Sequence, residues 1–194
     1  MTEQVPVWAE PITLEGWPTY VVDSTALRYA LPIREGWNPI PEVEELPMQV
    51  EHVYRGVYAS EWLTVAFMEK ADPSSNLRNW IDAVVRMVGF PILAMHQASD
   101  PPPELIEWQY VGAYPALSER LGVDETFLYH GAAKLPGRPP ELARIYTLLA
   151  RRGTMAWQVN LSFNSACPPG MPEEMIVSND HVRAGATFGY LRFL

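Results

Sequence analysis

The chain has 194 residues, of which 48% are hydrophobic and 19% charged, and its 14 basic against 23 acidic side chains give a formal net charge of −9. This length and composition predict one compact globular domain rather than a disordered chain. The acidic balance argues against nucleic acid and anionic membrane surfaces as partners, and it leaves a basic protein partner open.

The N-terminal part of the sequence predicts an arm, residues 1–24, followed by a single α+β domain, residues 25–194. Residues 34–47 bring three prolines and four glutamates together, so we expect a solvated loop there. Before this loop, alternating apolar positions predict a strand, at Leu27, Tyr29, Leu31 and Ile33. After it, residues 48–58 and 61–69 are rich in β-branched and aromatic side chains and predict two more strands.

The apolar period changes from that of a strand to that of a helix in residues 77–88. The stripe consists of Leu77, Trp80, Ile81, Val84, Val85 and Val88. This spacing predicts an amphipathic helix, with Gly89 suited to its C-terminal cap and Pro91 preventing its continuation.

Strands resume after this helix in residues 91–99, 105–114 and 125–135, with a short helix or a turn at 115–122. Residues 142–163 predict a hairpin whose turn falls near Arg151, Arg152 and Gly153. In its second arm the apolar side chains alternate with polar ones, as Met155, Trp157, Val159 and Leu161 against Gln158, Asn160 and Ser162.

A final helix follows, because Pro172 suits a first helical position and an apolar stripe then runs to the C-terminus. The stripe consists of Val177, His181, Ala184, Phe188 and Leu191. Few helices separate the strands, so the sequence predicts an α+β fold: a largely antiparallel sheet of about seven to eight strands packed by two main helices.

The order of these elements resembles the PsbP/DcrB-like fold group. The likeness rests on RYALPIREGW (28–37), the strand EWLTVAFME (61–69), the helix NLRNWIDAVVRMVG (76–89), the hairpin ARIYTLLARRGTMAWQVNLSF (143–163) and the closing helix. It covers the chain from about residue 25 and rests on order and spacing rather than on a specific signature. The resemblance implies a non-catalytic protein, since members of that group bind photosystem subunits, a small GTPase or partners in secretion systems.

Cys167 is the only cysteine of the chain, so an internal disulfide is excluded and we expect a cytoplasmic protein in a reducing compartment. The first residues, MTEQVPVWAEP, lack the basic and apolar regions of a signal peptide. The apolar runs are far shorter than the roughly 20 residues of a membrane-spanning helix, so we expect no insertion into a membrane.

The candidate catalytic residues are Cys167, Asp180 and His181. A nucleophilic cysteine needs a nearby base, but Cys167 is followed by two prolines and a glycine, so a plain junction between strand and helix explains it as well. His181 falls on the helical stripe, where a core histidine is the simpler interpretation, although Asp180, His181 and Arg183 would also suit the wall of a pocket. The four histidines, His52, His96, His130 and His181, have no metal-ligand spacing, so we expect no metal and no cofactor.

The chain has seven tryptophans, which is many for its length. Three of them, Trp8, Trp17 and Trp37, lie in the proline-rich N-terminal part. Exposed tryptophans are typical binding anchors, although filling the ends of the sheet core is the simpler interpretation of these three. Arg183 is a further candidate contact. We therefore expect a non-catalytic protein-binding adaptor, chaperone or assembly factor of a bacterial type, with a secretion-associated role as one option. Two alternatives stay open: a thiol or acid–base enzyme using Cys167 and His181, and a domain that binds a small apolar ligand.

Overall fold

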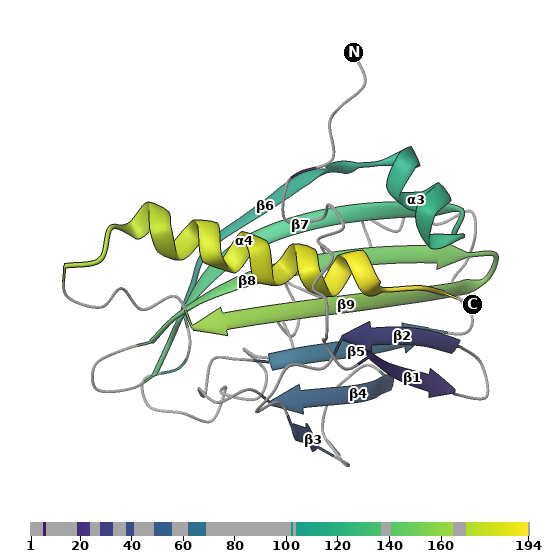
Figure 1. Ribbon diagram of the computed structural model, residues 1–194, viewed down its shortest axis with the longest axis horizontal. Coiled ribbons are helices and arrows are strands. Elements are labelled where there is room, and N and C mark those ends of the chain that lie inside the picture. The colour runs from purple at the N-terminus through teal and green to yellow at the C-terminus, as the bar shows by residue number, and fades with distance from the viewer. Residues whose placement is uncertain are drawn as a thin grey trace.

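The computed structural model describes residues 6, 19–23, 28–32, 38–40, 49–55, 62–68, 102, 104–136, 141–164 and 170–193. The predicted helix 77–88 and the predicted strand 91–99 lie outside these residues. Figure 1 shows the arrangement: helix α4 (Glu173–Tyr190) crosses one face of an antiparallel sheet, and the short helix α3 (Pro115–Leu121) lies near one end of that sheet. None of the described helices is long and apolar enough to span a bilayer.

The described strands form a seven-stranded sheet and a separate hairpin. The hairpin pairs β1 (Thr19–Asp23) with β2 (Arg28–Pro32), so residues 19–23 of the predicted arm contribute a strand, and β2 contacts α4. The sheet has the order β3-β4-β5-β9-β8-β7-β6, with antiparallel neighbours throughout. Its strands are β3 (Asn38–Ile40), β4 (Gln49–Arg55), β5 (Trp62–Met68), β6 (Glu104–Ala113), β7 (Glu125–Leu135), β8 (Glu141–Arg152) and β9 (Met155–Asn164). The antiparallel class and the helix packed on the sheet confirm the predicted α+β fold.

Two local predictions need correction. Residues 38–40, predicted to be part of a solvated loop, form the edge strand β3, because the backbone of Asn38–Ile40 pairs with Val53–Arg55 despite Pro39. An edge strand tolerates a proline, since one side of its backbone needs no ladder hydrogen bond. Pro172 is the N-cap of α4 rather than its first helical residue, because its ψ of 140° is extended.

The β8–β9 hairpin forms where the sequence predicted it. Arg152 pairs with Met155, so Gly153 and Thr154 form a two-residue loop, and Gly153 has a φ of +57°. Such tight hairpin loops need a positive φ, which glycine adopts without a steric penalty. The Gly153 backbone N–H also donates to Asp124 Oδ2 at 2.7 Å. Arg152 links the hairpin to two other segments: its Nε donates to the Gly122 carbonyl (2.8 Å) and its Nη2 donates to the Phe193 carbonyl (2.7 Å).

The core lies between the sheet and the C-terminal half of α4. Alternation sends Trp157, Val159, Leu161 and Phe163 of β9 to this face, where they form one buried cluster with Ala184, Phe188 and Leu191. Trp157 also stacks on Phe193, with 4.8 Å between the ring centroids.

The polar side chains of β9, which point to the opposite face of the sheet, are buried as well. On this opposite face Thr147 Oγ1 donates to Asn160 Oδ1 at 2.7 Å, and Gln158 Nε2 donates to the same oxygen at 3.0 Å. The central strands are therefore buried on both faces, and hydrogen bonds satisfy polar atoms that have lost water.

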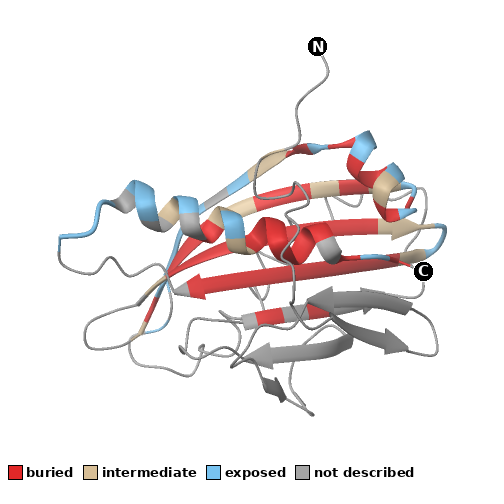
Figure 2. Cartoon of the chain, viewed as in Figure 1, coloured by how far each residue is buried: buried red, intermediate tan, exposed pale blue. Residues whose placement is uncertain are grey.

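Helix α4 divides into an exposed and a buried half. Figure 2 shows its N-terminal turns largely exposed and its C-terminal turns buried, and residues 184–189 are all buried. The boundary falls near Asp180, His181 and Arg183, which are the helical residues that the sequence analysis singled out.

Candidate functional site

The sheet presents a polar cluster to the middle of α4. Two pairs of register neighbours form it: His130 of β7 lies opposite Tyr146 of β8, and Arg144 of β8 lies opposite Phe163 of β9. The His130 and Tyr146 rings are 4.9 Å apart between centroids, and Tyr146 and Phe163 are 5.9 Å apart. Arg144 is only 8% exposed, so this guanidinium is nearly removed from water.

Helix α4 places three polar side chains over this cluster. The His181 ring lies 6.4 Å from the His130 ring and 5.8 Å from the Tyr146 ring between centroids, in both cases edge to face. The Arg183 guanidinium carbon lies 4.2 Å from the Phe163 ring centroid, a cation–π contact. Asp180 is 1% exposed, and its Oδ1 lies 3.6 Å from Arg183 Nη1, so these two groups balance each other's charge one helical turn apart.

The surroundings favour the neutral form of both imidazoles. Burial, and after it the positive charge of Arg144, lowers the pKa of both His130 and His181, while Glu107 partly opposes this effect at His130. Burial, followed by the negative charge of Asp180, raises the pKa of the Tyr146 phenol, which therefore stays protonated. The Nε2 atom of His130 is buried without a hydrogen-bond partner among the described residues.

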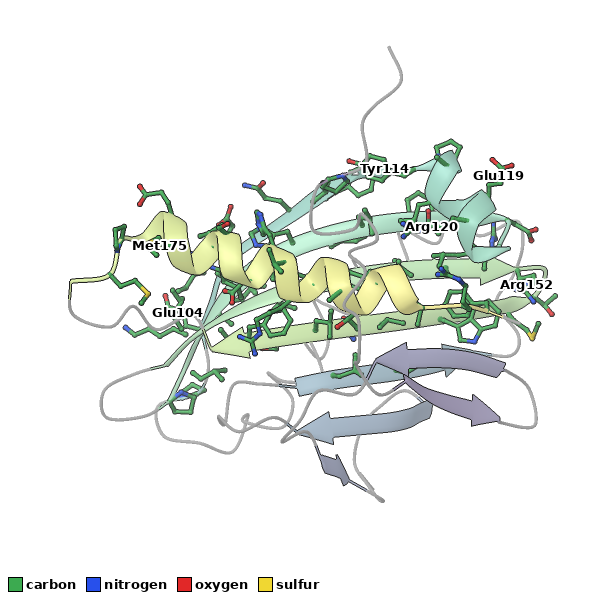
Figure 3. All side chains as sticks on the ribbon, viewed as in Figure 1. Glu104, Tyr114, Glu119, Arg120, Arg152 and Met175 are labelled. Atoms are coloured by element: carbon green, nitrogen blue, oxygen red, sulfur yellow. The ribbon has the colours of Figure 1, made fainter. Side chains whose placement is uncertain are left out.

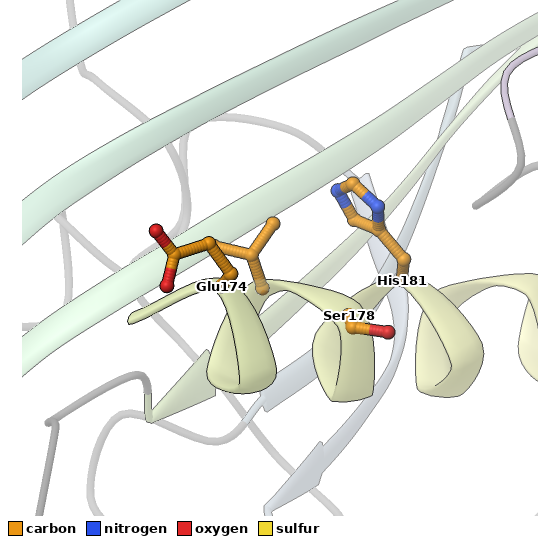
Figure 4. A pocket seen from close by; sticks show the side chains of 4 residues that line it. Glu174, Ser178 and His181 are labelled. Atoms are coloured by element: carbon orange, nitrogen blue, oxygen red, sulfur yellow. The ribbon is translucent and has the colours of Figure 1, made fainter. Parts of the chain in front are cut away.

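An open groove runs beside the N-terminal half of α4. It has a volume of about 380 Å³, and the described residues that line it are Glu174, Val177, Ser178 and His181. Figure 4 shows the labelled side chains Glu174, Ser178 and His181 on consecutive turns of the helix. His181 is therefore shared between the groove and the buried cluster.

Apolar side chains are exposed on a side of α4 that does not line the groove. Met171 just before the helix is 40% exposed, Met175 59% and Val182 42%. Met175 and Val182 are seven residues apart, which places them on one side of the helix, and Met171 lies just before its first turn. We call these three exposed side chains the outer stripe. Figure 3 shows Met175 at the opposite end of the molecule from Glu119 of α3.

The structure brings together three of the residues that the sequence singled out, Asp180, His181 and Arg183. Cys167, Trp8, Trp17 and Trp37 lie outside the described residues, so the Cys167–His181 dyad and the tryptophan anchors stay predictions. Among the described residues, no group of three histidine, cysteine, aspartate or glutamate side chains is placed to hold a metal ion.

Sequence reasoning missed His130, Arg144 and Tyr146 as members of the site. They lie on two strands, and only the β7–β8 register brings them under α4. The one available signal was that Arg144 and His130 interrupt otherwise apolar strands.

The described cluster is suited to proton uptake and hydrogen bonding. Its two neutral imidazoles can accept protons, whereas the Tyr146 phenol stays protonated and the Asp180 carboxylate balances the charge of Arg183. The described groove residues thus offer one carboxylate, one hydroxyl, one imidazole and one apolar side chain.

Comparison with known proteins identifies the fold. No protein-family model matches the sequence, and no curated protein matches it. Among solved structures, the chain is similar to the solution structure of cyanobacterial PsbP (CyanoP) from Synechocystis sp. PCC 6803. The TM-score is 0.52 and the sequence identity 15%, over 94% of this chain and 95% of that chain. The fold of this protein is therefore PsbP-like, which confirms the resemblance inferred from the order of its elements.

Proposed function

We propose that this chain is a non-catalytic protein-binding module, an adaptor, chaperone or assembly factor of the cytoplasm, that binds its partner on the N-terminal half of α4. The observation that carries the proposal is the outer stripe: Met175 and Val182 are 59% and 42% exposed on a helix whose C-terminal turns are buried, and Met171 just before this helix is 40% exposed. Burying each such side chain against a partner contributes about 1 to 2 kcal/mol.

Methionine suits this role because its long, flexible and polarizable side chain adapts to partners of different shape. The helix offers the spacing of apolar anchors that helix–groove and helix–helix recognition uses. The PsbP-like fold is in keeping with this proposal, since protein binding is what the resemblance to that group implied.

The charge of the chain defines the chemistry of the partner. The net charge is −9, and Glu174 is exposed on the first turn of α4, where it lines the groove. Since opposite potentials favour association, the partner is a segment with apolar anchors flanked by lysine or arginine.

The test compares quantitative affinity co-purification by three forms of the chain: wild type, the double variant Met175→Glu with Val182→Glu, and Ile106→Glu. Ile106 is 55% exposed on β6, so it provides a matched change of an exposed apolar side chain to an acidic one on a different element. We expect a protein retained by wild type and Ile106→Glu to be lost with the double variant. We expect this retained partner, once purified, to bind the wild-type chain in a direct titration. Its contact segment should contain apolar anchors flanked by basic residues.

Circular dichroism provides the folding control for all three forms. Equal retention by wild type and the folded double variant would contradict the proposal, as would a partner whose contact segment is acidic. Turnover of a small substrate abolished by Cys167→Ser would instead favour the thiol enzyme.

A further inference from the structure

We propose that His130 and His181 form an acid-sensitive latch that holds the N-terminal half of α4 against the sheet and releases it when the pH falls. This inference goes beyond the proposed function, because it concerns a conformational change of the chain alone. It rests on the geometry of the cluster: one imidazole belongs to the sheet, the other to the helix, and their centroids are 6.4 Å apart.

The latch lies where α4 changes from exposed to buried. His181 is the helical residue in ring contact with both His130 and Tyr146. Beyond it, Ala184 and Phe188 belong to the buried core cluster, which keeps the C-terminal half docked. Before it, the described side chains Glu174, Met175 and Ser178 are exposed. Gly185 follows the latch and weakens the helix there by about 1 kcal/mol relative to alanine.

Two guanidinium groups, three carboxylates and one phenol lie around the two imidazoles. From the strands, β8 contributes the Arg144 guanidinium and the neutral Tyr146 phenol, and β6 contributes the Glu107 carboxylate near His130. From α4, Asp180 pairs with Arg183, and Glu174 lies on the wall of the groove.

Two protonated imidazoles would add two positive charges beside Arg144 without a new counter-charge inside the cluster. A buried charge that lacks a partner is costly, so the cluster favours neutral rings. Releasing the helical half lets water solvate both imidazolium ions and separates His181 from Arg144.

The direction of the pH dependence follows from linkage. Burial and Arg144 lower the pKa of both rings in the docked state, so the released state binds more protons at pH values below the ordinary histidine pKa of 6.5. Above that pH the latch is closed and insensitive to pH. As the pH falls through 6.5 the docked state loses stability relative to the released one, until the docked rings themselves take up protons.

The test is hydrogen–deuterium exchange of the whole chain at several pH values from 8 to 5, expressed as protection factors to remove the intrinsic pH dependence of exchange. We expect protection of the amides of residues 174–183 to fall below pH 6.5, by up to about tenfold per pH unit for each imidazole that takes up a proton on release. Protection of residues 184–190 and of β8 should change little in the same range.

The matched variants are His130→Gln with His181→Gln, which should remove the pH dependence of residues 174–183, and His52→Gln in β4, which should keep it. If the double variant does not fold, each single variant should halve the number of protons taken up. Constant protection in wild type between pH 8 and 5 would overturn the latch, and so would an unchanged pH dependence in the His130 and His181 variants. Because no partner is present, these results are independent of the proposed binding function.

Discussion

Arg144 is the residue through which the sheet acts on both histidines of the site. Its guanidinium is 8% exposed, and after burial it is the largest cause of the lowered pKa of His130 and of His181. An apolar side chain of similar length removes this charge and keeps most of the packing. Replacing Arg144→Met is therefore expected to raise the pKa of both imidazoles.

Histidine ring signals followed by NMR during a pH titration measure this effect directly. The control is Arg192→Met, because Arg192 donates to the carbonyls of Gly189 and Leu191 at the other end of α4. The titration midpoints of His130 and His181 should both move to higher pH in Arg144→Met and stay unchanged in the control. Unchanged midpoints in Arg144→Met would mean that Arg144 does not cause the lowered pKa of the two histidines.

Gly153 is a second position where one residue decides a local structure. Its φ of +57° in the two-residue β8–β9 loop is a conformation that costs other residues roughly 1 to 2 kcal/mol. We expect Gly153→Ala to lower the free energy of unfolding by about this amount and Gly153→Asn to lower it less, since asparagine tolerates a positive φ. Urea denaturation of the three forms provides the measurement, and equal losses for alanine and asparagine would argue against this backbone explanation.

The residues of the site differ in how far the sequence could predict them. Asp180, His181 and Arg183 lie within one helical turn, so their proximity follows from helical geometry alone. His130 and Arg144 are 14 positions apart on two strands, and they meet only through the pairing that sets Ala132 opposite Arg144. Strand register depends on long-range packing, which residue spacing in the sequence does not reveal.

At the scale of elements, α4 packs with one half and displays the other. The sequence predicted its buried stripe, and Ala184, Phe188 and Leu191 indeed lie in the core. It did not predict the outer stripe, because Met175 and Val182 fall outside that buried stripe and single apolar side chains on a helix surface are ordinary.

Two substitutions in α4 test whether one half of this helix is packed and the other half exposed. Phe188 is fully buried, so Phe188→Ala should lower the free energy of unfolding by about 3 to 5 kcal/mol. Met175 is 59% exposed, so Met175→Ala should change it by less than about 0.5 kcal/mol. Chemical denaturation measures both. A loss of several kcal/mol in Met175→Ala would mean that this side chain packs within the chain, and the outer stripe would then no longer support partner binding.

At the scale of the whole molecule, local patterns predicted the antiparallel class, while the strand order required the structure. Hairpins such as β8–β9 join neighbours in sequence and could be inferred from their turn residues. The pairing of β5 with β9 sets Leu63 opposite Leu161, almost a hundred positions further on. This pairing joins strands β3-β4-β5 to strands β9-β8-β7-β6, and Leu63 and Leu161 both lie in the buried core cluster. No short-range period in the sequence carries that information.

The net charge of −9 gives the last prediction, on the affinity for the basic partner that we propose. Exposed charges are screened by salt, so this affinity should fall steadily as the ionic strength rises from about 0.05 to 0.5 M. Glu174→Lys should weaken binding by about two- to fivefold at low salt, because an exposed pair contributes at most about 1 kcal/mol.

The matched control is Glu119→Lys, which makes the same charge change on exposed α3, at the end of the molecule opposite Met175. It should alter the affinity less than Glu174→Lys does, because screening reduces interactions across distances beyond a Debye length of about 10 Å. Titration calorimetry with the purified partner measures all three forms. Equal effects of the two substitutions would mean that only the overall charge attracts the partner, and that Glu174 is not next to the bound segment.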